Sequence, residues 1–316
     1  MKKIILLNLV ILFFFIIFLE ILANLFNLSQ LLGTESKLIE RRNNSHYLVP
    51  GSTGKIFNTK VYIDNNGFRV PSLNYKYTGI KDVYIIGDSV AFGSGVKEEK
   101  TFVGLLRKRF NNINFYNSSV PGYQINNHID NLGKAKDFKK IDQLIYFFTL
   151  NDVYSSTNVQ QRRADRKSKL FDKKIFGKVN SYLRNKSHLY LYIKGIASDP
   201  SKRWFFALDS FYKEKDISFI KEEFKKIKNF SIANNSNLII FLLPYEYQTR
   251  HCDNKDFLPQ KKIINTLKKV EVKFIDYTQN FCDNKDKDNF LKFDPMHLSI
   301  NGHKKVYNLL LNEKIF

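Results

Sequence analysis

The chain has 316 residues, of which 43% are hydrophobic and 26% charged, a balance that supports a packed globular core and excludes a disordered chain. Its formal net charge is +21, from 51 Lys and Arg against 30 Asp and Glu, and such a charge suits an anionic surface or polymer. We expect no nucleic-acid partner, because the basic residues are scattered among acids and form no Arg-rich arm, zinc-finger spacing or aromatic RNA-binding signature.

The chain begins with a strongly apolar segment. Two lysines precede the apolar run 4–19, and Glu20 separates that run from a second one at 21–26. The segment is long enough to span a membrane if Glu20 reaches the interface, and it is longer than the apolar region of a cleaved signal peptide. We predict an uncleaved signal anchor over residues 1–27, with the rest of the chain on the extracytoplasmic (periplasmic) side of the cell membrane. A cleaved signal peptide is the alternative.

Residues 28–80 carry turn signals but no regular apolar pattern. A cluster of Pro, Gly, Ser and Thr occupies 50–54, and the stretch 64–69 indicates a hairpin or a tight turn. We expect a connector of irregular structure, partly packed on the main domain.

From residue 81 onward, short apolar strands alternate with helical patterns. This alternation predicts a parallel sheet covered on both faces, and therefore an α/β domain over residues 81–316 with three layers, α/β/α. The predicted strands are 83–86, 113–116, 143–150, 238–243 and 272–275, and the predicted helices are 101–110, 125–134, 217–234, 263–269 and 300–312.

Residues from about 154 to 215 interrupt the alternation. They contain a basic run at 161–169 and two aromatic-rich stretches at 187–193 and 204–211. We predict an insertion of helices beside the site, which serves as a substrate wall, a lid or a membrane-facing surface.

Polar residues follow the first three predicted strands, where a parallel sheet places its sites. The first group, Gly87-Asp88-Ser89, brings a hydroxyl to a turn at the start of a helix. Free main-chain N–H groups and the helix dipole favour negative charge there. Ser89 is therefore either a nucleophile or the N-cap of the helix.

A second diagnostic pair lies before the last predicted helix. Asp294 and His297 are three residues apart, so the carboxylate can bond Nδ1 of the imidazole and leave Nε2 free to take a proton. This spacing alone usually marks a local hydrogen-bond pair, and Ser89 gives it a catalytic partner. We expect the other histidines named here to be structural or to have no catalytic partner: His128, His188, His251 and His303.

Four separated blocks resemble those of the SGNH hydrolases, also called GDSL-type esterases. They span residues 82–316 in the family's order and are Gly87-Asp88-Ser89 with Gly93 and Gly95, Val120-Pro121-Gly122-Tyr123, Asn151-Asp152, and Asp294-Pro295-Met296-His297. The resemblance implies a flavodoxin-like fold with no cofactor and no metal.

Site roles also follow from this resemblance. It implies Ser89 as the nucleophile, His297 as the general base and Asp294 as the acid that orients it. The implied oxyanion hole combines the N–H groups of Ser89 and Gly122 with the side chain of Asn151. The family's third block usually has glycine two residues before the asparagine. Thr149 stands there in this chain, and we expect it to change the shape of the acyl pocket.

The glycines of the first block also carry an expectation. Gly87 permits the turn, and we expect Gly93 and Gly95 to keep the helix entry low enough for a substrate to approach.

The anchor, the Asn65–Arg69 turn and the aromatic insertion resemble membrane-anchored envelope members of the family, some of which transfer or remove acyl groups on polysaccharides. The resemblance implies an esterase or O-acyltransferase that works through an acyl-serine, with O-acylated envelope carbohydrate or a small ester as substrate and with envelope-assembly partners.

Two other functions stay open. One is a catalytically silent binding or scaffold domain in an envelope polysaccharide assembly complex. The other is a metal-dependent phosphoesterase with ligands among Asp88, Asp152, Asp294 and His297, although the sequence lacks the His- and Asp-rich clusters typical of such sites.

The chain has two cysteines, Cys252 and Cys282. In an oxidising compartment they can form one disulfide, which would stabilise the fold by about 3–4 kcal/mol for a loop of this size. Two unpaired thiols are the alternative.

Overall fold

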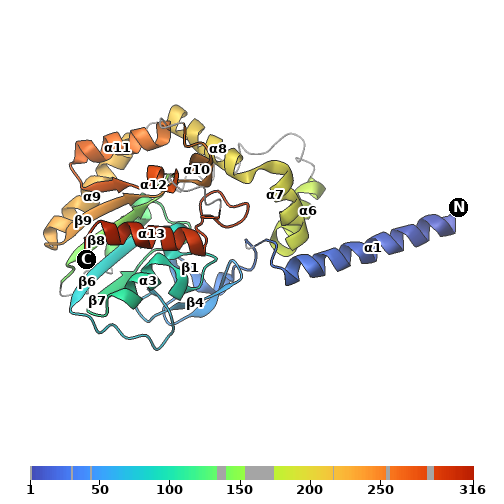
Figure 1. The fold of residues 1–316 in the computed structure, drawn as a ribbon, viewed down its shortest axis with the longest axis horizontal. Coiled ribbons are helices and arrows are strands. Elements are labelled where there is room, and N and C mark those ends of the chain that lie inside the picture. Colours follow the sequence, from blue (N-terminus) through green and yellow to red (C-terminus); the bar gives the residue numbers. More distant parts are fainter. Residues whose placement is uncertain are drawn as a thin grey trace.

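The computed structural model describes residues 2–29, 31–42, 45–133, 140–153, 174–215, 217–253, 257–282 and 288–316. Figure 1 shows a layered α/β body and a long helix, α1 (Lys2–Leu25), that projects from it. The basic run at 161–169 lies outside the described residues.

A mixed sheet of eight strands forms the centre of the body. Five of its strands are parallel and lie in the order β10-β9-β8-β6-β7. This is the strand order of flavodoxin-like sheets, and it confirms the predicted α/β class. The five strands are β6 (Lys81–Gly87), β7 (Ile113–Asn117), β8 (Gln143–Phe148), β9 (Asn237–Leu242) and β10 (Phe274–Asp276).

The parallel strands are buried because helices cover both faces of the sheet. All six residues of β8 are buried, as an apolar strand at the centre of a covered sheet must be. One helical layer pairs α3 with α13, and the other packs α9 against α4 and α11. The layers contain α3 (Phe102–Arg109), α13 (Ile300–Asn312), α4 (Ile125–Asn131), α9 (Ser218–Ala233) and α11 (Leu258–Val270).

The prediction of irregular structure for residues 28–80 is wrong. β3 (Thr53–Ile56), β4 (Thr59–Ile63) and β5 (Arg69–Val70) extend the sheet beyond β7 in antiparallel order, so the sheet is mixed rather than wholly parallel. These strands have two to five residues, too few for an alternating pattern to stand out, and tertiary pairing fixes them. A separate two-stranded sheet pairs β1 (Ile39–Arg42) with β2 (Ser45–Leu48).

A second hydrophobic cluster joins these N-terminal strands to the body. It places buried side chains of β2, β3 and β4 against Phe92 and against the loop after β7. Its buried members are Leu38, Leu48, Ile56, Val61, Ile63, Phe92, Val120 and Tyr123. Of two short 3-10 helices, η1 (Ser36–Leu38) contributes Leu38 to this cluster, and η2 (Glu98–Lys100) packs with α3 and α13.

Helices α6 (Lys174–Lys186), α7 (His188–Ser198) and α8 (Pro200–Glu214) lie between α1 and the body (Figure 1). The Glu20 carboxylate of α1 accepts hydrogen bonds from the N–H groups of His188 (2.7 Å) and Leu189 (3.2 Å). It therefore satisfies donors that the first turn of α7 leaves unpaired. Of the described helices, α1 alone is long and apolar enough to cross a membrane, which fits an anchor or a signal sequence.

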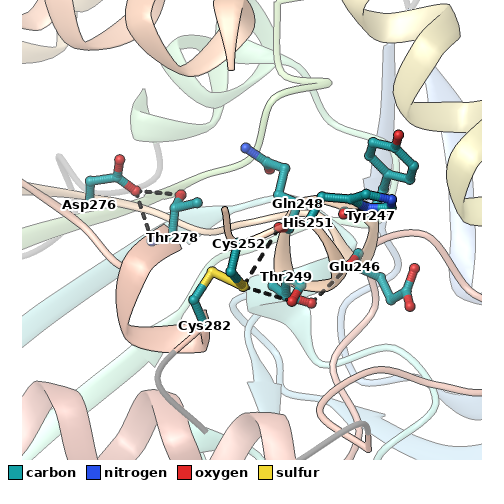
Figure 2. The surroundings of a disulfide bond; sticks show 9 residues. All are labelled: Glu246, Tyr247, Gln248, Thr249, His251, Cys252, Asp276, Thr278 and Cys282. Atoms are coloured by element: carbon teal, nitrogen blue, oxygen red, sulfur yellow. Dashed lines mark hydrogen bonds between the residues drawn. A yellow bond between two sulfur atoms is a disulfide. The ribbon is translucent and has the colours of Figure 1, made fainter. Parts of the chain in front are cut away.

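The two cysteines form a disulfide, with their Cα atoms 5.5 Å apart (Figure 2). The bond joins the segment after α10 (Glu246–Arg250) to the end of α12 (Thr278–Cys282). The main-chain N–H of Glu246, at the start of α10, donates to the carbonyl of Pro295 at 2.9 Å. The disulfide thus holds a helix that contacts the Asp294–His297 loop.

Candidate active site

The first sequence block forms a sharp turn between β6 and the short helix α2 (Ser89–Phe92). A Cβ on Gly87 would lie 2.5 Å from the Cβ of Ala91, so glycine is needed for the helix to fold back on the strand. The N-cap is Asp88, whose Oδ1 accepts from the N–H of Val90 at 2.8 Å. Ser89 is therefore not required as the cap, and its hydroxyl is available for other partners.

Ser89, His297 and Asp294 meet although 208 residues separate the first two. Ser89 Oγ lies 2.7 Å from His297 Nε2, and His297 Nδ1 lies 2.8 Å from Asp294 Oδ2. The other oxygen of Asp294 accepts main-chain N–H groups from Met296 (2.8 Å) and His297 (2.7 Å). The carboxylate is thereby fixed in place, and it orients the imidazole toward the hydroxyl.

Two opposing influences set the protonation of His297. Burial lowers the pKa of the imidazole, but the adjacent Asp294 carboxylate raises it, and the net pKa lies above the ordinary 6.5. The ring is therefore a stronger base than a free histidine and is neutral only above that raised pKa.

Two main-chain N–H groups can receive negative charge, one on Ser89 and one on Gly122, whose loop meets the Ser89 turn where the Val120 N–H donates to the Gly87 carbonyl at 3.0 Å. Those of Ser89 and Gly122 donate to no acceptor in the part of the chain that the structure describes. Gly122 has φ of +83°, a conformation that favours glycine. Nε2 of His46, from β2, donates to the carbonyl of Pro121 at 2.7 Å and so supports this loop from outside the α/β domain.

Asn151 lies at the carboxyl end of β8, beside the Gly87–Ser89 turn. Its Nδ2 donates one hydrogen to Asp88 Oδ2 at 3.1 Å, and its Oδ1 accepts from the Tyr245 hydroxyl at 2.8 Å. These bonds fix the amide so that its second N–H hydrogen stays available. The sequence analysis missed Tyr245, although its place three residues after β9 was a signal for a residue at this edge.

Thr149, at the position where the family usually has glycine, lies beneath the site, and its effect on an acyl pocket stays a prediction. It is buried, and its hydroxyl lies between Asp88 Oδ2 (3.0 Å) and Asp152 Oδ1 (3.1 Å), and 2.9 Å from Asn151 Oδ1. Burial, with the Asp152 charge nearby, raises the pKa of Asp88 to about 6, and burial raises the pKa of Asp152 to about 7. Thr149 therefore bridges two acids that would otherwise face each other beneath the site.

Arg69 gives the Asn65–Arg69 turn a physical role. Its fully buried guanidinium donates to the carbonyls of Phe92, Gly93 (2.7 Å) and Val96 (2.5 Å), and so satisfies main-chain groups after α2. A Cβ on Gly93 would lie 2.8 Å from Arg69 Nη1. Gly93 therefore makes room for Arg69 and also for Thr101, whose Cγ2 a Cβ would meet at 2.5 Å. The expectation that it serves substrate entry stays a prediction.

Gly95 is explained in the same way. It has φ of +83°, and a Cβ there would lie 2.7 Å from the side chain of Leu291. It thus admits a neighbour from the segment before the Asp294–His297 loop, and the expectation that it serves substrate entry stays a prediction.

Phe57 is a second contact that sequence reasoning missed. It forms the turn between β3 and β4 with Asn58, and both residues have positive φ, 50° and 57°. A phenylalanine in this conformation is strained, and strain of this kind concentrates at functional sites. Its ring meets His297 edge-on, with the centroids 5.0 Å apart.

The remaining histidines lie outside this arrangement. His303 is fully buried and its Nδ1 accepts from the N–H of Phe102 at 3.4 Å, while burial lowers its pKa to about 3. Burial also lowers the pKa of His128 to about 3. Within the described residues, no group of three His, Cys, Asp or Glu side chains is placed to hold a metal ion.

A cavity of about 310 Å³ adjoins His297. A larger cavity, of about 680 Å³, opens at the amino ends of the strands, and none of the residues predicted for the site lines it. The smaller one is therefore the space relevant to the predicted chemistry.

The chain has distant likenesses among known proteins. No protein-family model matches the chain, and no curated protein does either. A solved structure of a member of the lipolytic G-D-S-L family from Veillonella parvula has 14% identity and a TM-score of 0.44, and covers 73% of this chain and 97% of its own. A lipase/acylhydrolase from Enterococcus faecalis has 15% identity and a TM-score of 0.43, with 74% and 95% covered.

An acetylxylan esterase from Geobacillus stearothermophilus, solved as a catalytic mutant, has 13% identity and a TM-score of 0.45, with 76% and 97% covered. These descriptions agree with the family that the four sequence blocks resemble. At this identity and TM-score the likeness carries no argument about activity, which rests on the site.

Proposed function

We propose that this chain is a serine esterase or O-acyltransferase that works through an acyl-serine. The observation that carries the proposal is the chain of two hydrogen bonds from Ser89 Oγ through His297 to Asp294, at 2.7 and 2.8 Å. A serine hydroxyl is a weak nucleophile at its free pKa and needs a base at this distance. Its position beside two available N–H groups suits acyl transfer.

The proposed first half-reaction forms the acyl-serine. Ser89 Oγ attacks the ester carbonyl carbon while His297 Nε2 takes the hydroxyl proton. The carbonyl oxygen becomes an oxyanion, which the N–H groups of Ser89 and Gly122 and the free hydrogen of Asn151 Nδ2 stabilise. Collapse of this intermediate breaks the bond to the alcohol oxygen, and His297 gives that oxygen its proton.

The second half-reaction decides between hydrolysis and transfer. His297 takes a proton from water or from a sugar hydroxyl, the resulting nucleophile attacks the acyl carbon, and Ser89 regains its proton. We propose O-acylated envelope carbohydrate or a small ester as the substrate. We also propose that α1 anchors the enzyme in the membrane, because it is long and apolar enough to cross one. The two lysines before its apolar run favour a cytoplasmic N-terminus and therefore an extracytoplasmic α/β domain.

Fluorophosphonate labelling of the full chain in detergent micelles tests this proposal. We expect stoichiometric labelling at Ser89, identified by mass spectrometry of the labelled peptide, and none in Ser89→Ala. A folded sample, judged by circular dichroism, that does not label would contradict the proposal and favour a silent scaffold domain.

A second assay separates the two half-reactions. An activated acetyl ester is incubated with the chain, with and without an oligosaccharide acceptor. Acetylated sugar identifies a transferase, and release of acetate alone identifies a hydrolase.

A further inference from the structure

The cavity beside His297 has walls of two kinds. One wall is the loop that carries the histidine, with Met296 and the ring of Phe293. The other is formed by α6, α7 and α8, which contribute apolar and cationic side chains. Three cations line the cavity, and they are Arg184, Lys194 and Arg203.

The position of this cavity tells which part of an ester enters it. His297 Nε2 delivers the proton to the leaving alcohol oxygen, so the alcohol must lie on the histidine side of the reacting carbon. The cavity is lined by His297, whereas Ser89, Gly122 and Asn151 are not among its lining residues. The alcohol half of the ester, or the acceptor alcohol in transfer, therefore faces the cavity.

The acids near this wall are already engaged. Asp294, the one carboxylate that lines the cavity, is bonded to His297. Asp199 and Glu246, at neighbouring helix ends, both pair with Arg250. In the described part of the chain, no salt bridge joins Arg184 or Arg203 to a carboxylate. The cavity therefore holds an excess of positive charge.

Lys194 is the third cationic side chain that lines the cavity. Its Nζ lies 3.3 Å from the amide oxygen of Asn180, a neutral partner. Burial lowers its pKa, and the nearby charges of Arg184 and Arg203 lower it further. Three like charges on one wall are unfavourable in the empty site, and an anion between them would relieve the repulsion.

We propose, on the basis of the proposed acyl-serine chemistry, that the alcohol half of the substrate carries a phosphate or carboxylate that Arg184, Lys194 and Arg203 bind. The volume of about 310 Å³ is at the lower end for ligand pockets and suits a small group such as one glycerol or sugar unit with its anion. Trp204 lines the same cavity and offers an aromatic face to the rest of that group.

The anion can belong to a lipid headgroup or to a soluble alcohol, because both present the same chemistry. Ser29 and Leu31, shortly after α1, also line the cavity, so the site opens near the end of the apolar helix. The experiment below separates these two sources.

Matched esters test the proposal in the full chain in neutral detergent micelles. The pair is 1-O-acetylglycerol 3-phosphate and 1-O-acetylglycerol, and the readout is the ratio of their kcat/KM values. We expect the phosphate ester to be preferred by about tenfold or more, and the preference to shrink with added salt. Arg203→Gln should move the ratio several-fold toward one. Lys202→Gln, on the same helix but outside the cavity, is the matched control and should leave the ratio unchanged.

Binding is measured without turnover. Trp204 is the chain's single tryptophan, so its fluorescence reports on this cavity alone. In Ser89→Ala we expect glycerol 3-phosphate to change the emission and glycerol to leave it unchanged, with the response lost when Arg203→Gln is added. Equal responses to the two ligands, or an unchanged response in the double variant, would overturn the anion site.

Labelling of Ser89 tests the proposed function, whereas the ester ratio and the Trp204 response test the anion site, so the two proposals can fail separately. If Ser89 labels with fluorophosphonate but both esters react equally, the anion proposal fails and the proposed function stands. If Ser89 does not label but Trp204 still responds to glycerol 3-phosphate, the proposed chemistry fails and the anion site stands.

Nanodiscs identify the source of the anion. Discs of phosphatidylcholine are compared with discs that also contain phosphatidylglycerol. If phosphatidylglycerol alters Trp204 emission and competes with glycerol 3-phosphate, the anion is a lipid headgroup. If glycerol 3-phosphate binds equally in both discs, it is a soluble alcohol. Absence of any Trp204 response to either ligand overturns the proposal.

Discussion

The α/β domain and the segments added to it contribute differently to the site. The α/β domain, meaning β6–β10, α13 and the helices between these strands other than α6–α8, supplies Ser89, His297 and Asp294 together with the N–H donors. The added segments, meaning β1–β5 and α6–α8, supply contacts from outside. Phe57 meets the ring of His297, and His46 supports the loop before Gly122. We infer that the α/β domain sets the chemistry and the added segments set which ester is used.

The packing of α7 shows how closely the added segments approach the site. A Cβ on Gly195 would lie 2.4 Å from the ring of Phe293, the residue before Asp294. Only glycine lets α7 come this near to the loop. If the two regions have these separate roles, substitutions in the α/β domain should lower activity toward every ester. Substitutions in the added segments should lower activity by amounts that differ between esters.

The largest effect is expected from Asp294→Asn. An amide cannot stabilise the imidazolium or hold its tautomer, and kcat should fall by about 10⁴-fold for every ester. Steady-state kinetics on two unlike esters measures this, with Asp209→Asn as the control, because this partly buried acid pairs with Lys213 on α8. A loss of activity confined to one ester would contradict the inference that the α/β domain sets the chemistry.

The pH profile of the unaltered chain adds a related prediction. His297 acts as a base only when neutral, and its pKa is raised above 6.5, so activity is full above that raised pKa and is lost as the pH falls through it. The acidic limb of the kcat/KM profile should therefore lie above pH 6.5. Full activity at pH 4.5 would argue against His297 as the base.

Asn151→Ala should have the next largest effect. Loss of one oxyanion donor typically costs about 2.7–4 kcal/mol, so kcat should fall by roughly 10²–10³-fold with every ester. Asn237→Ala, at the other end of the sheet, is the matched control. An unchanged kcat would remove Asn151 from the proposed oxyanion hole.

Thr149→Val tests the buried acids beneath the site. The change keeps the shape but removes the hydroxyl between Asp88 and Asp152, and the free energy of unfolding at pH 8 should fall by about 1.5–3 kcal/mol. Urea unfolding at pH 8 and pH 5 measures it. The loss should be smaller at pH 5, because both acids are then protonated and no longer repel; an equal loss at both pH values would contradict this account.

Asp88 and Asp152 also determine how the free energy of unfolding of the unaltered chain changes with pH. Their pKa values are raised to about 6 and about 7, above the ordinary 3.8. The folded state therefore favours the protonated carboxyls. The stabilisation that they give is full below about pH 3.8 and is lost as the pH rises through 6 to 7.

The smallest effect is expected from Phe57→Ala. An edge-on aromatic contact contributes about 0.5–1.5 kcal/mol, so kcat/KM should fall by about twofold to tenfold, by an amount that differs between esters. Phe206→Ala, an exposed ring on α8, is the control. A loss as large as that of Asn151→Ala would show that the added segments take part in the chemistry itself.

Much of this site could be predicted from the sequence because it follows local rules. An apolar run that ends in Gly87-Asp88-Ser89 marks the carboxyl end of a strand, and parallel strands bring such ends to one edge whatever their separation. The spacing of Asp294 and His297 allowed their bond, and the apolar run of α1 was plain from composition. These features depend on neighbours along the chain.

Only the tertiary structure decided the rest. Phe57 lies in a short turn between β3 and β4, the buried contacts of Arg69 join separate segments, and Tyr245 bonds Asn151 across 94 residues. The cavity wall of α6, α7 and α8 depends on how those helices pack against the loop of His297. Such contacts arise from the fit of distant surfaces, which hydrophobic periodicity and motif spacing do not encode.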